Sequence, residues 1–333
     1  MCNAPAKILF QGGALFVMIP DDAKVPLPRS SPQLEMNEHY PRIRHPAWNG
    51  GLLIREGIRI CLYMNHPHEE ISSKVASSMK TYLRAVGPGT LSWSPDYNGD
   101  WWELDDSARE KTLRELRDER APGDLVFEWY ESPDSARGYE VEYCGKLPDS
   151  VERNAVSAVS FWLPTEYLEE KGLEHVRELM WELAEPLPFC SGHAGLAFNH
   201  VGIPRELSFL RFRHPGLDDT DLMHVSWNIG TRIRGPAWIN FLGAPVLDEL
   251  GGVTGLRSRF SSQEVRVQEM PGNRAVVTLG SWPEAGDTEQ GRDLPLYREW
   301  ANALEPWLYQ EPRTQYPLDG EETLRWERRF LDR

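Results

Sequence analysis

Cysteine is scarce in this sequence, and its spacing argues against a disulfide framework or a zinc site. The four cysteines, Cys2, Cys61, Cys144 and Cys190, lie far apart and form no CxxC pair. The sequence also lacks any Asn-x-Ser/Thr acceptor for N-glycosylation. We therefore expect reduced thiols in a cytoplasmic protein, with Cys61 and Cys144 buried within strands as small apolar side chains.

Long hydrophobic runs are lacking as well. The best candidate, residues 8–19, is interrupted at Gln11-Gly12-Gly13 and is too short to span a bilayer. It also lacks a convincing cleavage site for a secretory signal. A proline-rich segment, residues 25–32, then separates it from Met36. We predict no membrane partner, and we treat residues 1–35 as an N-terminal extension that the sequence does not prove to be native.

Basic residues are few relative to acidic ones. The chain has 36 Lys and Arg against 51 Asp and Glu, which gives a formal net charge of −15. The electrostatic field of a chain with this net charge repels nucleic acid and anionic membranes and attracts basic proteins or cations. We therefore predict no direct nucleic-acid ligand. The alternative is that the acidity serves only solubility.

The pattern that is present, from about residue 57, alternates strand-like and helix-like segments. Residues 58–64 alternate as a strand, and apolar residues then recur at helical spacing from Ile71 to Val86. Similar strand-to-helix units are expected at residues 155–183, with one helix after Pro164, and at residues 274–308. A hairpin is expected between strand candidates at residues 124–130 and 138–144.

These units predict an α+β fold, a mixed or antiparallel sheet with helices packed on one face. The recurrence of strand, helix and strand leaves open a duplication into two related halves, roughly residues 36–150 and 151–333. No low-complexity tract or linker divides the chain after Met36. A single domain over residues 36–333 is therefore the simpler interpretation.

The usual catalytic, metal and cofactor motifs are missing. Ser191-Gly192-His193 places a hydroxyl beside an imidazole, and an aspartate from residues 218–221 would complete a triad on paper. No Gly-x-Ser-x-Gly turn is present, so we interpret this segment as a polar turn between a helix and a strand. Residues 66–70 lack the His-Glu-x-x-His spacing and are typical of a helix start. We predict no catalytic residue, no cofactor and no metal site.

Tryptophan, in contrast, is abundant. The chain has 13 tryptophans, and some lie beside acids and turn residues, most densely in residues 93–106. A tryptophan buried at a protein interface commonly costs roughly 2 kcal/mol or more when truncated. The alternative is that these side chains fill the core. An acidic, aromatic loop suits capture of a basic protein better than capture of a small metabolite.

Several blocks of the sequence, taken as a set, resemble a known family. They are residues 38–44 (EHYPRIR), 57–64 (GIRICLYM), 82–89 (YLRAVGPG), 161–168 (FWLPTEYL), 187–198 (LPFCSGHAGLAF), 238–243 (WINFLG), 304–309 (LEPWLY) and 326–331 (WERRFL). This set is similar to the TsiV-type family of type VI secretion immunity proteins. The similarity runs from about Glu38 to the last residue and leaves residues 1–35 outside it.

The resemblance implies an immunity protein that neutralises an antibacterial effector by direct binding in the producer's cytoplasm, and it carries over no catalytic residues. Some members are similar to partners of effectors with a virus-type replication-repair nuclease domain. Such a nuclease presents a basic groove to DNA, which an acidic protein can occupy. We predict effector contacts in two acidic loops, at Asp96, Asp100, Trp101, Trp102, Glu103, Asp105, Asp106, Asp218, Asp219 and Asp221.

Two other functions stay open at this point. One is an enzyme, either a hydrolase or a modifier of the toxin, that uses Ser191 and His193. The other is a structural or adaptor subunit of a secretion or defence system without inhibitory action. The sequence identifies neither the effector nor the oligomeric state.

Overall fold

A computed structural model describes residues 38–47, 49–96, 98–117, 125–133, 135–136, 138–151, 154–202, 204–310 and 320–332. The predicted extension, residues 1–35, lies outside the described residues. All ten predicted effector contacts lie within them. No helix in the described ranges is long and apolar enough to cross a membrane.

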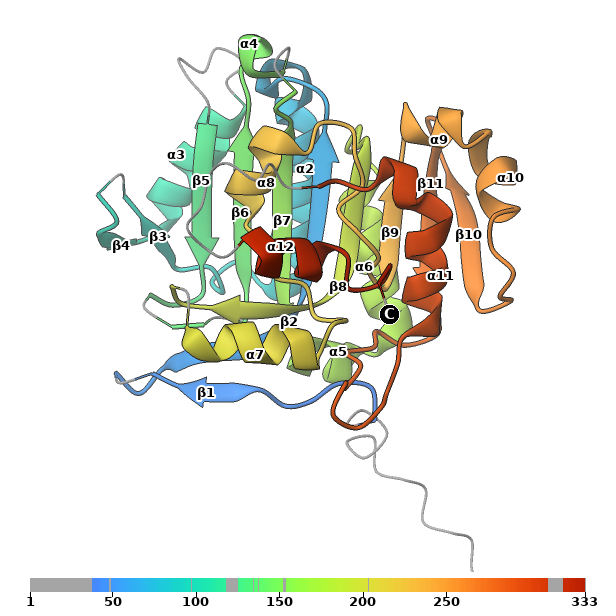
Figure 1. Cartoon of the computed structure of the whole chain (residues 1–333). Coiled ribbons are helices and arrows are strands. Elements are labelled where there is room, and N and C mark those ends of the chain that lie inside the picture. The colour runs from blue at the N-terminus through green and yellow to red at the C-terminus, as the bar shows by residue number, and fades with distance from the viewer. Residues whose placement is uncertain are drawn as a thin grey trace, which may run out of the picture.

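One large sheet organises the described chain (Figure 1). Its 11 strands run in the order β10-β11-β9-β8-β2-β7-β6-β5-β3-β4, with β1 paired to β2. The strands are β1 (Arg44–Pro46), β2 (Leu52–Met64), β3 (Trp93–Pro95), β4 (Trp101–Glu103), β5 (Leu125–Tyr130), β6 (Glu140–Gly145), β7 (Ser157–Pro164), β8 (Ser191–His200), β9 (Ile239–Leu242), β10 (Val265–Met270) and β11 (Arg274–Leu279).

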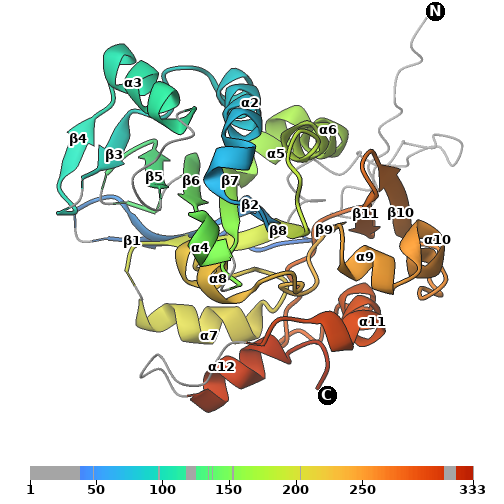
Figure 2. The same cartoon turned by 90° about the horizontal axis from the view of Figure 1, so that it is seen from above.

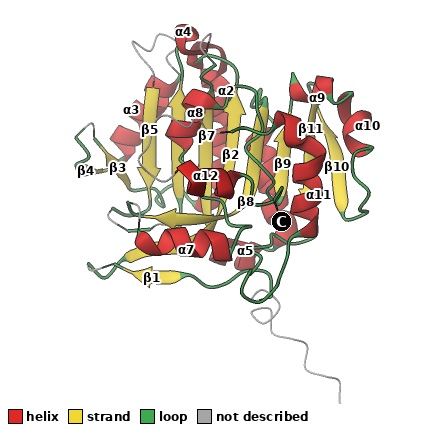
Figure 3. Cartoon of the chain, in the orientation of Figure 1, coloured by secondary structure: helices red, strands yellow, loops and turns green. Residues whose placement is uncertain are grey.

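The helices pack around this sheet and give the α+β class that the sequence predicts (Figure 3). They are α2 (His68–Val86), α3 (Asp106–Leu116), α4 (Pro148–Val151), α5 (Thr165–Lys171), α6 (Leu173–Ala184), α7 (Arg205–Arg213), α8 (Leu222–Asn228), α9 (Val246–Glu249), α10 (Gly252–Arg257), α11 (Pro295–Leu304), the 3₁₀ turn η1 (Glu305–Trp307) and α12 (Gly320–Glu327). Every pairing between these strands is antiparallel.

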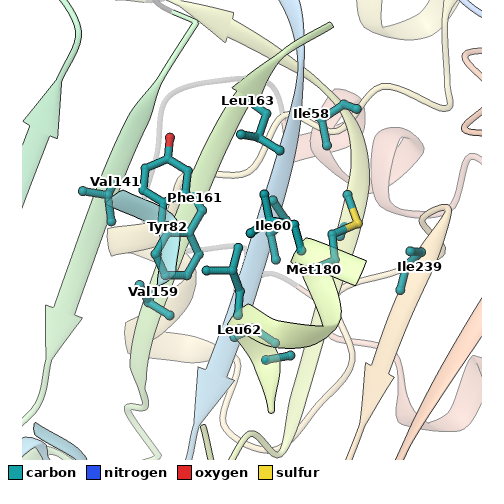
Figure 4. Close-up of a cluster of buried hydrophobic side chains, with 14 of the residues drawn as sticks. Ile58, Ile60, Leu62, Tyr82, Val141, Val159, Phe161, Leu163, Met180 and Ile239 are labelled. Atoms are coloured by element: carbon teal, nitrogen blue, oxygen red, sulfur yellow. The ribbon is translucent and has the colours of Figure 1, made fainter. Parts of the chain in front are cut away.

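The central strand β2 buries both of its faces. It pairs with β7 on one side and β8 on the other, and alternate residues point to opposite faces of the sheet. Ile58, Ile60 and Leu62 define the back face, where they pack with Tyr82 of α2 and Met180 of α6 (Figure 4). This apolar cluster is the largest part of the core.

The opposite, front face is defined by Arg59, Cys61 and Tyr63. Its apolar part includes Cys61 and Tyr63 together with Leu222 and Val225 of α8. Figure 2 shows α2, α5 and α6 on one side of the sheet and α7, α8, α11 and α12 on the other. The expectation that helices pack on one face only was therefore wrong, because both faces of β2 carry apolar residues that need cover.

The local predictions are mostly confirmed. Strand β2, helix α2, the β5–β6 hairpin and strand β11 with helix α11 all form where the periodicity places them. The single helix expected after Pro164 is wrong: the chain breaks at Gly172, whose φ of +83° ends α5 and starts α6. The polar turn expected at Ser191–His193 is also wrong, because these residues open β8 and pair with both β2 and β9.

The two proposed halves share this sheet. Strand β6, before residue 150, pairs with β7 after it, and β2 pairs with β8. A common origin of the halves, and the domain limits at residues 36 and 333, stay predictions.

Candidate functional site

The first predicted acidic loop forms the β3–β4 hairpin and the start of α3, at one edge of the sheet (Figure 1). Asp96 organises the turn, because its carboxylate accepts hydrogen bonds from the backbone N–H groups of Asn98 at 2.8 Å and Asp100 at 2.9 Å. Asp105 caps α3 by accepting a bond from the Ala108 N–H at 2.7 Å. Both carboxylates remain exposed while they hold the backbone.

The other side chains of this loop face solvent to different degrees. Trp101 is half-buried and packs edge-on against Tyr130 of β5, with ring centroids 5.3 Å apart. Trp102 is 40% exposed, and Asp100 and Glu103 beside it are exposed too. The Asp106 side chain is 98% exposed and pairs with Arg109 at 3.2 Å. The hairpin thus combines an aromatic contact area with several solvated carboxylates.

The second predicted loop is mostly occupied by internal contacts. Asp218 accepts a hydrogen bond from His193 Nε2 at 3.2 Å, and Asp219 bonds His200 Nε2 at 3.1 Å and lies 3.6 Å from Arg211. Only Asp221 is exposed, and it caps α8 by accepting a bond from the His224 N–H at 2.8 Å. Asp221 is therefore exposed to a binding partner, whereas Asp218 and Asp219 are engaged in contacts within the protein.

The position of Asp218 follows from the length of β9. Strand β9 covers only Ser191–Ala194 of β8, so the same edge of β8 is free beyond Ala194. The Asp218 segment bonds there, through the Phe198 N–H to the Asp218 carbonyl at 2.9 Å and the Asp218 N–H to the Leu196 carbonyl at 2.8 Å. This places the Asp218 carboxylate beside His193, 25 residues away in sequence.

The His193–Asp218 contact forms a buried ion pair. Burial alone would lower the pKa of His193, but the Cys61 sulfur and the Asp218 carboxylate outweigh it and raise that pKa to about 9. Burial alone would raise the pKa of Asp218, but attraction to His193 and Arg234 holds it well below its usual range. His193 is therefore charged near neutral pH in the folded protein.

The structure adds a group of carboxylates that sequence reasoning did not single out. Glu128 of β5 and Glu142 of β6 are direct cross-strand partners on the front face, and Glu140 lies two residues from Glu142. Arg59 Nη2 reaches Glu142 at 3.1 Å. Burial, together with repulsion from Glu128, Glu140 and Asp221, outweighs Arg59 and raises the pKa of Glu142 to about 8. The sequence alone gives no sign of this group, because the strand register decides which residues meet. Like charges directly opposite each other normally destabilise a strand pair, so this pairing is not one that we would expect.

Exposed apolar side chains gather at the same end of the molecule. Within the described ranges, the large apolar side chains classed as exposed are Trp102, Val126, Phe209, Met223 and Trp227. They lie on β4, β5, α7 and α8, and none lies on β9–β11 or α9–α11 (Figure 1). Helix α8 packs on β6 and β7, and Lys146 Nζ at the end of β6 lies 3.5 Å from the Trp227 ring centroid. We call Asp100, Trp102, Glu103, Asp106, Val126, Asp221, Met223 and Trp227 the interaction face; it extends from α8 on the front of the sheet around the β4 edge to α3 on the opposite side (Figure 2).

The Ser191 and His193 side chains do not form a nucleophile–base pair. Ser191 is buried, and its hydroxyl donates to the Arg232 carbonyl at 2.8 Å. His193 Nε2 bonds Asp218, and no hydrogen bond joins the two side chains in the described part of the chain. His66 of the second candidate segment pairs with Glu70 at 2.7 Å. Within the described ranges, no group of three or more His, Cys, Asp or Glu residues is placed to hold a metal ion.

An open groove of about 680 Å³ lies where β2 ends and β8 begins. His66, Lys74 and Arg274 line it together with prolines and Phe189, and its lining contains no carboxylate. Arg274 is committed to backbone carbonyls, including that of Glu185 at 3.0 Å. The groove therefore has the opposite charge from the interaction face.

Comparisons with known proteins identify a family and a similar solved structure. The TsiV family model, described as type VI immunity for VRR-NUC, matches residues 74–330. A search of curated proteins finds no match. Among solved structures, the Pseudomonas aeruginosa T6SS protein PA0821 is similar with a TM-score of 0.72 and 21% identity, over 90% of this chain and 89% of that one. At this identity the likeness shows a shared fold alone.

Proposed function

Because the chain belongs to the TsiV family of type VI immunity proteins, we propose that it neutralises a cognate antibacterial effector by direct stoichiometric binding. The family description names VRR-NUC, so the proposed effector is a nuclease. Blocking takes place in the cytoplasm of the producing cell, without turnover and without a cofactor.

One observation supports this proposal: the exposed large apolar side chains of the described residues lie on β4, β5, α7 and α8, and the exposed acids Asp100, Glu103 and Asp221 lie beside them along the chain. Apolar patches rimmed by polar residues are typical of protein-binding surfaces. On the interaction face, Trp102, Val126, Met223 and Trp227 supply the apolar contacts. The carboxylates lie around and between them.

The sign of the charge matches the proposed partner. A nuclease binds the DNA backbone with lysine and arginine, so its active groove is basic. Acidic side chains facing that groove accelerate encounter and reject anionic competitors. A central aromatic anchor then slows dissociation. Glu128 of β5 is partly exposed on the same side of the strand as the exposed Val126, where it strengthens the negative potential.

The ten predicted contact residues take two roles in this proposal. Those on the hairpin, together with Asp221, contact the effector directly. Asp218 and Asp219 act from inside, because their bonds to His193, His200 and Arg211 hold the loop that leads to α8. They position Asp221 and the exposed face of α8.

The test is a binding and protection experiment with the effector encoded beside this gene. Wild type should form a complex on gel filtration and restore growth of cells that express the effector. Trp102→Ala should weaken binding about 30-fold, the equivalent of about 2 kcal/mol at a hot spot. The charge reversal Asp100→Lys with Glu103→Lys should slow association and weaken its dependence on salt.

A matched control is available on the far edge of the sheet. Glu264 and Glu269 flank or lie in β10 and are exposed. Glu264→Lys with Glu269→Lys changes the net charge by the same amount, so it should leave binding nearly unchanged. Equal losses in the two double variants would place the interface elsewhere. Growth protection without any complex would overturn stoichiometric inhibition itself and favour a modifying enzyme.

A further inference from the structure

A narrow cavity of about 10 Å³ lies on the front face between β2, β8 and the C-terminal segment. Its charged lining consists of Arg59, His193, Asp218, Arg234 and Arg329. Gly195, Gly216 and Gly235 line it as well, so backbone approaches closely. A cavity of roughly this size holds one water-sized occupant.

Three of the cations that line the cavity have an anionic partner. Arg59 pairs with Glu142 at 3.1 Å, His193 with Asp218 at 3.2 Å, and Arg234 lies 3.7 Å from Glu327. Of these acidic partners, Glu142 has its pKa raised to about 8 and is largely protonated at pH 7, so it balances the charge of Arg59 only in part. The fourth cation of the lining has no such acidic partner among the described residues.

That fourth cation is Arg329. Its Nε donates to the Pro215 carbonyl and its Nη1 to the Trp326 carbonyl, each at 2.9 Å, and its guanidinium stacks 3.8 Å from the Trp326 ring centroid. No carboxylate of the described residues forms an ion pair with it. Burial lowers the pKa of Arg329 to about 9; attraction to Asp218 and Asp219 opposes this shift, and repulsion from Arg234 and Arg211 adds to it. The cavity lining therefore carries more positive than negative charge.

The lining also contains hydrogen-bonding nitrogens without a protein partner. Arg59 Nε and His193 Nδ1 are buried and have no nitrogen or oxygen acceptor in the protein, although the Cys61 sulfur lies close enough to His193 to raise its pKa. Arg59 and His193 are only 6% and 4% exposed. An arginine Nε carries a proton in every state, and the Nδ1 of a protonated histidine does so too. Both nitrogens are donors that need an acceptor, since a buried unsatisfied donor costs about 1–3 kcal/mol.

We propose that this cavity binds one small monovalent anion of chloride size, held by Arg329 and by the free N–H groups of Arg59 and His193. A polyatomic anion such as phosphate is too large for the space. Water fits the space, but it supplies no charge to balance Arg329. The Asp218 carboxylate, which also lines the cavity, is compensated by its bond to His193.

The position of the cavity indicates what the anion does. Arg59 belongs to β2, His193 to β8, and Arg329 follows α12 near the C-terminus. An anion shared by these three side chains ties the C-terminal segment to the centre of the sheet. The proposal is independent of effector binding, because none of these residues belongs to the interaction face.

Thermal unfolding of the full chain at pH 7 tests the proposal, with sodium chloride compared with sodium gluconate at equal ionic strength. Gluconate is too large for the cavity. Chloride should raise the midpoint by roughly 2–4 °C and then saturate, as expected for a ligand that binds the folded state alone. Arg329→Gln should abolish the difference between the two salts. Arg325→Gln, which removes the same charge from exposed α12, should retain it.

A second measurement does not depend on the variants folding. Crystals of the wild-type chain grown or soaked in sodium bromide should show an anomalous peak between Arg59, His193 and Arg329. Equal midpoints of wild type in chloride and gluconate would overturn the proposal. A cavity that holds water and no bromide would overturn it as well.

Discussion

The buried His193–Asp218 pair predicts how stability depends on pH. The pKa of His193 rises from an ordinary 6.5 to about 9 in the folded protein, while that of Asp218 falls. A raised histidine pKa means that the folded state holds its proton more tightly than the unfolded chain does. The resulting stability is fully present below pH 6.5 and is lost as pH rises through 9. At about 1.4 kcal/mol per pH unit, His193 contributes up to about 3 kcal/mol.

Two further groups, Asp218 and Glu142, also change the stability of the folded protein with pH. The lowered pKa of Asp218 gives stability that is present above about pH 4 and is lost as pH falls further. Glu142 has the opposite effect on stability. Its pKa of about 8 makes ionisation costly in the folded state, so stability declines as pH rises from about 4.5 to 8. The protein should therefore be most stable in mildly acidic solution.

Urea unfolding followed by tryptophan fluorescence at pH 6, 7, 8 and 9 measures this dependence. Wild type should lose stability progressively from pH 6.5 to 9. His193→Gln should be less stable than wild type at pH 6 and should show a flatter decline. Glu142→Gln, which keeps His193, should retain the decline that extends to pH 9. Parallel curves for wild type and His193→Gln would refute the assignment.

Three other predictions concern single side chains. Ser191→Ala removes the bond to the Arg232 carbonyl and should cost about 1 kcal/mol in urea unfolding, yet cells should stay protected; loss of protection in a folded variant would favour catalysis. Gly172→Ala forces a side chain into a φ of +83° with a ψ of 162°, a region nearly exclusive to glycine, and should cost about 1–3 kcal/mol, whereas Gly89→Ala, with open space and no positive φ, should cost less. Trp300→Ala empties a fully buried site in α11 and should cost about 3–5 kcal/mol in denaturant titration; a smaller loss would mean that the apolar cluster that α11 forms with β11 repacks.

Much of the fold could be predicted because its signals are local. The apolar stripe of α2 and the alternation in β2 each lie within one segment, and so does the hairpin formed by β5 and β6. The break at Gly172 was missed because the apolar stripe continues across it while only one backbone angle changes. The start of β8 was missed because Ser191, Gly192 and His193 look like a turn, although strands on both sides bury them.

The residues of the interaction face also differ in whether the sequence could predict them. The sequence predicts an acidic, aromatic loop at residues 96–106, because its acids and tryptophans are neighbours along the chain; that the segment pairs as the β3–β4 hairpin is seen only in the structure. Met223 and Trp227 could not be predicted, since an isolated apolar residue on a helix gives no sign of being exposed. Glu128 and Glu142 meet only through strand register.

The sequence by itself determined the class of fold, the negative charge and the absence of familiar catalytic motifs, because composition and short-range periodicity carry those properties. A set of short sequence blocks also resembles the family that the comparisons identify. Tertiary structure alone decided which acids face solvent and which are committed to internal pairs. Asp218 and Asp221 are three residues apart, yet one bonds His193 beside β8 and the other lies exposed at the start of α8. That difference arises from the free edge of β8, which strand pairing between distant segments creates.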